Sequence, residues 1–224
     1  MLRKIFFPLL LGIAGCAVLI SLGVWQMQRL TWKSAILDDI DARITAVPVA
    51  LPDSPEPEAD RYLPVTLTGE TVGTPLYVLI SAKDLGAGYR LISPFQTGDR
   101  RIMVDLGYVP LQTLGADPVA ETLTITGNLH WPDEVDSWTP APDPSGIWFA
   151  RDVPAMAAAL NTEEIMLIAR TVSDTSLPST PLPVTSAGIP NDHLNYAITW
   201  FSLALVWAMM TFFLIFRVTR PKDV

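Results

Sequence analysis

Two long stretches without charged residues lie near the ends of the chain and flank a middle region of mixed polarity. Residues 5–25 and 197–216 contain no Asp, Glu, Lys or Arg. At a rise of about 1.5 Å per residue, about twenty helical residues reach about 30 Å, the thickness of a bilayer's hydrocarbon core. The pattern therefore predicts a transmembrane helix near each end, with one domain between them.

The first apolar stretch leads into a segment with helical periodicity. Leu30, Ile36, Leu37, Ile40 and Ile44 recur at spacings of three to four residues, which is typical of a helix with one apolar face. We therefore predict a juxtamembrane helix over about residues 26–44. Residues 46–64 contain five prolines and several acids, which indicates an extended linker.

From residue 62 the hydrophobic pattern approaches a period of two. Glycine and proline bound the alternating segments, which predicts strands at 62–68, 76–81, 89–96, 101–108, 123–130 and 165–171. One helix interrupts them, with Asp152 as its N-cap and Pro154 in its first turn. The predicted fold class is α+β: two transmembrane helices flank an extracytoplasmic, mainly antiparallel β domain that has a meandering sheet and one or two helices.

Basic residues next to the spans predict the orientation. Arg3 and Lys4 precede the first span, and Arg217, Arg220 and Lys222 follow the second. Because short basic flanks stay in the cytoplasm, both termini are expected there and the central domain in a periplasm. The predicted division is a tail at 1–4, spans at 5–25 and 193–216, a periplasmic domain at 26–192 and a tail at 217–224.

Charge and cysteine content exclude several function classes. Residues 26–192 carry ten Lys or Arg against twenty-two Asp or Glu, a balance that argues against nucleic acid and anionic lipid headgroups as partners of this domain. Cys16 is the only cysteine, so a disulfide or a copper-dithiol site is excluded. Cys16 also ends a lipoprotein-like Ile-Ala-Gly-Cys pattern, but residues 17–25 continue without charge. We therefore favour a retained anchor.

Catalytic constellations are missing from the sequence. His130 and His193 are the only histidines, and neither lies in a zinc-protease, catalytic-triad or Cys/His motif; Walker and dinucleotide-binding motifs are also absent. We interpret the acids Asp133, Glu134 and Asp136 as solvated. The chain is therefore not expected to be an enzyme.

His193 is the candidate ligand. Asn191 or Asp192 follows Pro190 and is expected to cap the second transmembrane helix, which places His193 in the first helical turn. The helix dipole there disfavours imidazolium, so a ring nitrogen keeps its lone pair for a metal.

Two aromatic residues are spaced to share the face of His193. Tyr196 and Trp200 follow it at i+3 and i+7, whereas Leu194 and Ile198 are expected to point elsewhere. A neutral imidazole beside aromatic rings suits a lipophilic macrocycle such as haem, held by one axial bond. The alternative, which pattern alone favours, is an interfacial aromatic belt that anchors the helix.

The other candidates have plainer interpretations. His130 ends a strand and is interpreted as a surface or packing residue. Arg90 offers a charge for propionates or for a partner's acids, and a salt bridge within the acidic domain is at least an equal alternative.

Six motifs stand in order along the chain: LGVWQMQRLTWK at 22–33, GYRLISPF at 88–95, IMVDLGYVP at 102–110, ITGNLHWP at 125–132, GIWFARDVPAMA at 146–157 and IPNDHLNYAITWFSLA at 189–204. In this order they resemble the Surfeit locus protein one family of cytochrome oxidase assembly factors. That family usually has Asn-Arg-Gly-Trp where this chain has Asp105 to Tyr108, and we assign no role to that loop.

The resemblance implies a function. Proteins of this family help to mature the haem-bearing subunit one of haem-copper oxidases, and bacterial members are associated with haem a. It implies His193 as the haem iron ligand and so favours the ligand over the belt. Helical spacing alone predicts Tyr196 and Trp200 as walls of the site. The expected partners are oxidase subunit one, haem a synthase and membrane lipid. The expected location is a bacterial plasma membrane, because a transit peptide is not evident before the first span. The rival hypothesis is a scaffold that stabilises the apo-subunit without binding a cofactor.

Overall fold

The computed structural model describes residues 2–82, 84–113, 122–173 and 179–220. The last four residues of the predicted C-terminal tail, which include Lys222, lie outside these ranges. The chain forms two compact units. The helical unit comprises Met1–Asp39 with Ser186–Val224, and the barrel unit comprises Ile40–Thr185.

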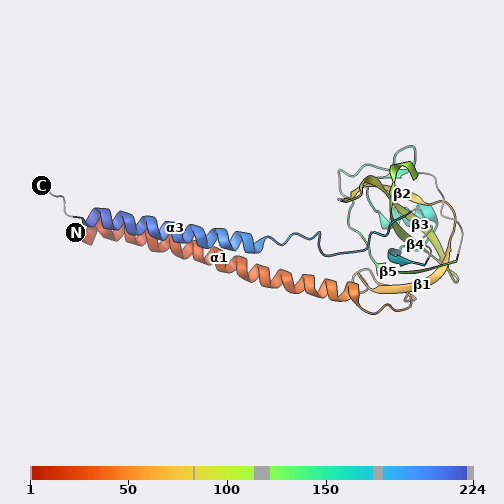
Figure 1. The fold of residues 1–224 in the computed structure, drawn as a ribbon, viewed down its shortest axis with the longest axis horizontal. Coiled ribbons are helices and arrows are strands. Elements are labelled where there is room, and N and C mark those ends of the chain that lie inside the picture. The colour runs from red at the N-terminus through yellow and green to blue at the C-terminus, as the bar shows by residue number, and fades with distance from the viewer. Residues whose placement is uncertain (1, 83, 114–121, 174–178, 221–224) are drawn as a thin grey trace. The chain divides into compact units, whose positions relative to one another are not determined.

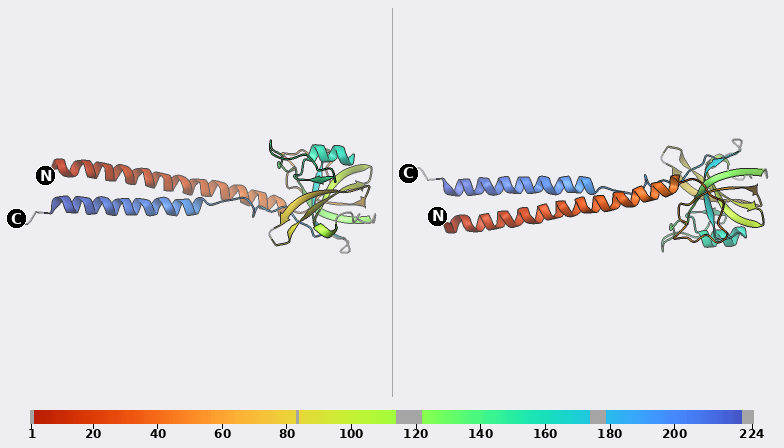
Figure 2. Two further views of the ribbon diagram at one scale, coloured as in Figure 1. Left: turned by 90° about the horizontal axis from the view of Figure 1, so that it is seen from above. Right: turned by 90° about the horizontal axis from the view of Figure 1, so that it is seen from below.

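Two long helices make up the helical unit. Helix α1 runs without a break over Leu2–Thr45, and α3 covers His193–Thr219. Both are long and apolar enough to cross a membrane, and they lie side by side (Figures 1 and 2). The pairing is antiparallel, because Gly12 packs on Thr211 near one end of the pair and Gly23 packs on Phe201 farther along.

Small residues allow the two helices to approach closely. A Cβ atom added to Gly12 would collide with the side chain of Thr211, and one added to Gly23 would lie 2.6 Å from Phe201 Cε1. On α3, Ala197 and Ala204 are buried in the same interface. Helices in lipid gain little from the hydrophobic effect, so such small-residue contacts are the expected means of association.

The barrel unit contains one sheet of seven strands. The predicted strands are confirmed, with ends that differ from the prediction by at most three residues. β6 was not predicted, since two residues are too short to show a period. The strands are β1 Pro64–Thr71, β2 Leu76–Ala82, β3 Gly86–Thr97, β4 Arg100–Pro110, β5 Thr122–Leu129, β6 Ile147–Trp148 and β7 Met166–Val172.

The predicted meander is wrong in two respects. The strand order is β1-β5-β7-β4-β3-β2-β6, and β1 also pairs with β3, which closes a ring of β1, β5, β7, β4 and β3. β7 therefore lies between β4 and β5, and it pairs in parallel with β4. Gly69 makes the closure possible, because a side chain there would collide with the backbone of Gln96 on β3. The α+β class and the mainly antiparallel sheet are confirmed.

The closed ring explains the core. β4 is buried on both faces from Ile102 to Val109, because one face fills the barrel and the other is covered by additional chain. Helix α2, Val153–Leu160, covers part of the barrel with the buried side chains of Met156 and Leu160.

The last turn of α1 is capped by barrel residues. The carbonyl oxygen of Ile44 accepts hydrogen bonds from Asn128 Nδ2 at 3.0 Å and from Arg170 Nη1 at 3.1 Å. Helix C-termini leave carbonyl groups without intrahelical partners, so these two donors satisfy an acceptor that would otherwise be buried unpaired. The end of the helix is thereby joined to strands β5 and β7.

The predicted cap of α2 is confirmed, and it gives a first testable prediction. Asp152 Oδ1 accepts a hydrogen bond from Ala155 N at 3.1 Å. We expect Asp152→Ala to lower the free energy of unfolding by about 1 kcal/mol, because a first-turn N–H loses its partner. Urea unfolding of the full-length protein in detergent measures this, and an unchanged midpoint would show that the cap contributes nothing.

Candidate functional site

The first turn of α3 carries the candidate ligand. Asp192 occupies the N-cap position, as one of the two predicted alternatives, but its side chain makes no capping hydrogen bond. His193 is the first helical residue and is only partly exposed. It belongs to the stripe of α3 that includes the buried Ala197 and Ala204, so its ring is directed toward α1.

A glutamine on α1 fixes the histidine ring. His193 Nδ1 lies 2.7 Å from Gln26 Oε1, and Gln26 is only 8% exposed. A carbonyl oxygen can only accept, so Nδ1 is the donor in this arrangement, and in the neutral ring Nε2 then keeps its lone pair. Outer hydrogen bonds of this kind orient histidines that bind metals and select their tautomer.

A second polar contact joins α1 to a residue just before the start of α3. Asn191 Nδ2 donates to Ser34 Oγ at 3.4 Å. Asn191 Oδ1 is buried and has no hydrogen-bond partner among the residues that the structure describes. The polar cluster formed by Gln26, Ser34, Asn191 and His193 therefore offers one imidazole lone pair and one buried carbonyl acceptor.

The neighbouring aromatic residues differ in exposure. Trp200 is partly covered, whereas Tyr196 is 56% exposed. Leu194 and Ile198 are also exposed. The structure thus places Trp200 near the stripe of α3 that meets α1 and Tyr196 at its outer edge. The part that each plays toward a ligand stays a prediction.

This donor set suits a ligand that supplies most of its own coordination. Within the described ranges, no three His, Cys, Asp or Glu side chains converge on a point that would hold a metal ion. A bare ion would need three or four protein ligands, whereas haem iron already has four nitrogens from its macrocycle and needs one axial group. The residues present are therefore compatible with haem, whose iron His193 Nε2 would hold.

His130 belongs to the barrel unit and is a packing residue. Its ring stacks on Tyr62, with 5.3 Å between ring centroids and 22° between planes. Burial, as the largest cause, and the positive charges of Arg151 and Arg61 together lower the pKa of His130 to about 4. The interpretation of His130 as a packing residue agrees with this environment.

The depressed pKa of His130 predicts a pH effect on stability. The unfolded chain binds a proton at this residue near pH 6.5, whereas the folded chain resists protonation until about pH 4. The unfolded state therefore gains protons first, and stability falls as pH is lowered through this window. We expect His130→Gln to weaken that dependence. Urea midpoints between about pH 7 and about pH 4 measure it, and parallel curves for both proteins would contradict it.

Arg90 takes part in a buried ion-pair network, so the salt-bridge alternative is confirmed. Its Nη1 lies 2.6 Å from Asp105 Oδ2, and Arg151 Nη1 lies 3.3 Å from the same oxygen. Asp105 is fully buried, and its other oxygen accepts from Gly107 N at 3.0 Å. Arg90 is therefore committed within the barrel unit.

Glu134 is exposed, as expected, but it is not without a partner. Its carboxylate forms an ion pair with Arg151 and also accepts from Arg151 N at 3.0 Å. Burial acts to raise the pKa of Glu134, but the hydrogen bonds and charge of Arg151 outweigh burial and hold it below its usual value. Asp133 and Asp136 are exposed, as expected, although Asp136 also organises its loop by accepting from Trp138 N.

Sequence reasoning missed Gln26 and Asp105. Gln26 is polar yet occupies a position in helical phase with Gly12 and Gly23, which was a usable signal. Asp105 stands in a run of apolar residues in β4, where an acid indicates a buried pair.

Comparison with known proteins identifies the family. The sequence pattern of the SURF1 family matches residues 13–205. The chain is 29% identical over 216 residues to a SURF1-like protein of Rickettsia felis, covering 89% of this chain and 92% of the relative.

Animal proteins show the same similarity. Identity to Surfeit locus protein 1 is 28% over 209 residues in Xenopus tropicalis, covering 82% of this chain and 67% of the relative. It is 27% over 219 residues in Homo sapiens, covering 86% and 72%. Together with the two apolar helices, these matches fit a two-pass membrane protein. The chain belongs to the SURF1 family.

Proposed function

We propose that this protein is a non-enzymatic assembly factor for haem-copper cytochrome oxidase, which binds haem a through His193 and aids its insertion into subunit one. The family supports the assembly role. The observation that carries the haem proposal is the buried contact of His193 Nδ1 with Gln26 Oε1 at 2.7 Å, because it leaves Nε2 free as a ligand.

The site residues act on the cofactor by binding and orientation. Haem would supply the iron, with its redox and oxygen chemistry. The protein would carry the haem to the oxidase. His193 would hold the iron through one bond, and Gln26 would keep the ring in the tautomer that can bind. Tyr196 and Trp200 would contact the macrocycle. A single axial bond suits a carrier that must also release its cargo to subunit one.

The proposed location is a bacterial plasma membrane. Arg217 and Arg220 lie beyond the apolar part of α3, which supports cytoplasmic termini and a periplasmic barrel unit. His193 would then lie near the outer surface, where haem a synthase could deliver haem a. The acidic surface of the central domain gives no support to nucleic acid as a partner.

A cofactor-free scaffold is the second candidate function. The His193–Gln26 hydrogen bond also joins α1 to α3, so it would serve a purely structural role equally well. Absorption spectroscopy separates the two functions. The full-length protein, purified from cells that make haem a, should show a Soret band, whereas a scaffold should show none.

Gln26 gives a testable prediction of its own. We expect Gln26→Leu to lower haem affinity by about 10–100-fold, because the ring of His193 loses the group that orients it. Gln26→Glu, which keeps an acceptor oxygen, should retain more binding. Gln28→Leu is the matched control, since Gln28 is exposed on the same helix. Haem titration of each purified protein measures the affinities, and equal values for Gln26→Leu and wild type would refute the role of Gln26.

A further inference from the structure

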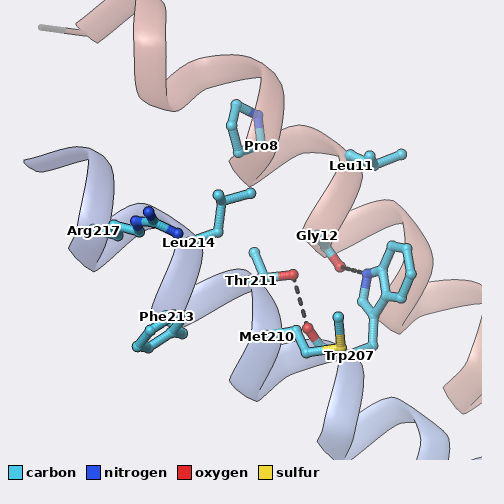
Figure 3. Close-up of a pocket in the computed structure, with 9 residues that line it drawn as sticks. All are labelled: Pro8, Leu11, Gly12, Trp207, Met210, Thr211, Phe213, Leu214 and Arg217. Atoms are coloured by element: carbon cyan, nitrogen blue, oxygen red, sulfur yellow. Dashed lines mark hydrogen bonds between the residues drawn. The ribbon is translucent and has the colours of Figure 1, made fainter.

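A groove lies between the two helices near the start of α1 and the end of α3. Its volume is about 340 Å³, within the rough range of 300–1,000 Å³ of small-molecule pockets. Pro8 and Leu11 of α1 and Phe213 and Leu214 of α3 form apolar walls. Figure 3 shows Arg217 beside Leu214 at one end of the groove and Trp207 at the other.

Internal hydrogen bonds leave the middle of the groove apolar. The indole nitrogen of Trp207 donates to Gly12 O at 3.2 Å, and Thr211 Oγ1 donates to Trp207 O at 2.8 Å (Figure 3). The donor groups of Trp207 and Thr211 are thus already used within the helix pair. The groove therefore offers a hydrocarbon-like surface that ends in the guanidinium of Arg217.

Arg217 differs from the other arginine at this end of α3. The guanidinium of Arg220 lies over the ring of Phe216, 4.6 Å from its centroid. No carboxylate within the described part of the chain forms an ion pair with Arg217. Within the described part of the chain its N–H donors are thus not paired with a carboxylate, and an anionic group at the end of the groove could accept from them.

A second groove of about 490 Å³ flanks the other side of the Gly12–Thr211 contact. It is lined by Leu9, Ile13 and Cys16 among others, and by no charged residue. Both grooves suit acyl chains. The side chains that line an empty groove lack dispersion contacts on one side, and a hydrocarbon chain would supply those contacts. Only the groove that ends in Arg217 also suits a charged headgroup.

We propose that this groove binds one anionic phospholipid, with an acyl chain along Pro8, Leu11 and Leu214 and the headgroup phosphate on Arg217. Guanidinium pairs with phosphate in a bidentate manner, and basic pockets between transmembrane helices bind anionic headgroups. The site is independent of His193 and of the proposed haem function.

Native mass spectrometry of the full-length protein in a non-ionic detergent tests the site, with phosphatidylglycerol or phosphatidylcholine added at equal concentration. We expect wild type to retain phosphatidylglycerol roughly tenfold better, and Arg217→Gln to lose this preference. Arg220→Gln is the matched control and should keep it. Leu11→Trp, which fills the groove, should weaken retention of both lipids.

Two results would overturn the proposal. One is equal retention of the two lipids by wild type, or retention of neither. The other is an equal loss of preference in Arg217→Gln and Arg220→Gln, which would indicate diffuse charge at the end of α3. Circular dichroism of each variant verifies that the helices are retained.

Discussion

His193→Ala is expected to lower haem affinity by about 100-fold or more. The substitution removes the proposed axial ligand, and even a group that only orients such a ligand is worth about 10–100-fold. Haem titration of the purified full-length protein measures the change, together with the cofactor content of protein isolated from cells that make haem a.

Asn195→Ala is the matched control for His193→Ala. Asn195 also lies in the first turns of α3 and is exposed. Removal of its side chain should therefore leave haem affinity unchanged. A His193→Ala protein with the cofactor content and spectrum of wild type would show that the ligand assignment is wrong. Equal losses in both variants would point to a disturbed helix start instead.

Asp105→Ala is expected to lower the free energy of unfolding by about 3–5 kcal/mol, which is the usual cost of removing one partner from a buried ion pair. Arg90 and Arg151 both contact Asp105 Oδ2, so the substitution leaves two nearby guanidinium groups without their shared carboxylate. Gly107 N also loses its acceptor. Denaturant unfolding of the full-length protein, followed by tryptophan fluorescence, measures the effect.

Two further variants make the Asp105 result specific. Asp133→Ala removes an exposed acid of the same unit and should change stability by about 0.5 kcal/mol or less. Asp105→Asn keeps an acceptor for Gly107 N while removing the charge, so it should fall between the other two. If Asp105→Ala were no more harmful than Asp133→Ala, the network would not stabilise the barrel.

Local pattern was sufficient to predict the helices and six of the seven strands that the structure describes. The ends of β2 and β4 were predicted to within two residues, because glycine and proline bound them. The N-cap of α2 was predicted for the same reason, since capping depends on a short local sequence. These features are encoded within a few residues of where they occur.

The closure of the barrel was beyond such local pattern. β7 inserts between β4 and β5, a pairing between segments distant in sequence. β4 also lacks alternation, because a strand buried on both faces is apolar at nearly every position. The closed ring had to be observed in the structure.

The sequence predicts the position of the candidate ligand but not the hydrogen-bond partner that orients it. The position of His193 followed from the helix start, but its orientation depends on Gln26, more than 160 residues earlier in the chain. No role is assigned to Asp105 from the sequence, because residues 105–108 depart from the pattern of the family, although Asp105 lies in β4 at the centre of a buried network. Both residues are polar in apolar surroundings, a signal that indicates a partner without identifying it.

Imidazole rescue of His193→Gly tests the central claim most directly. The glycine variant keeps the helix pair but lacks the ring, and added imidazole can enter the space and supply the missing nitrogen. We predict that haem in the wild-type protein shows the spectrum of a nitrogen-ligated iron, that His193→Gly loses it, and that imidazole restores it. A His193→Gly protein with the wild-type spectrum before imidazole is added, or a wild-type protein that binds no haem at all, would contradict the account.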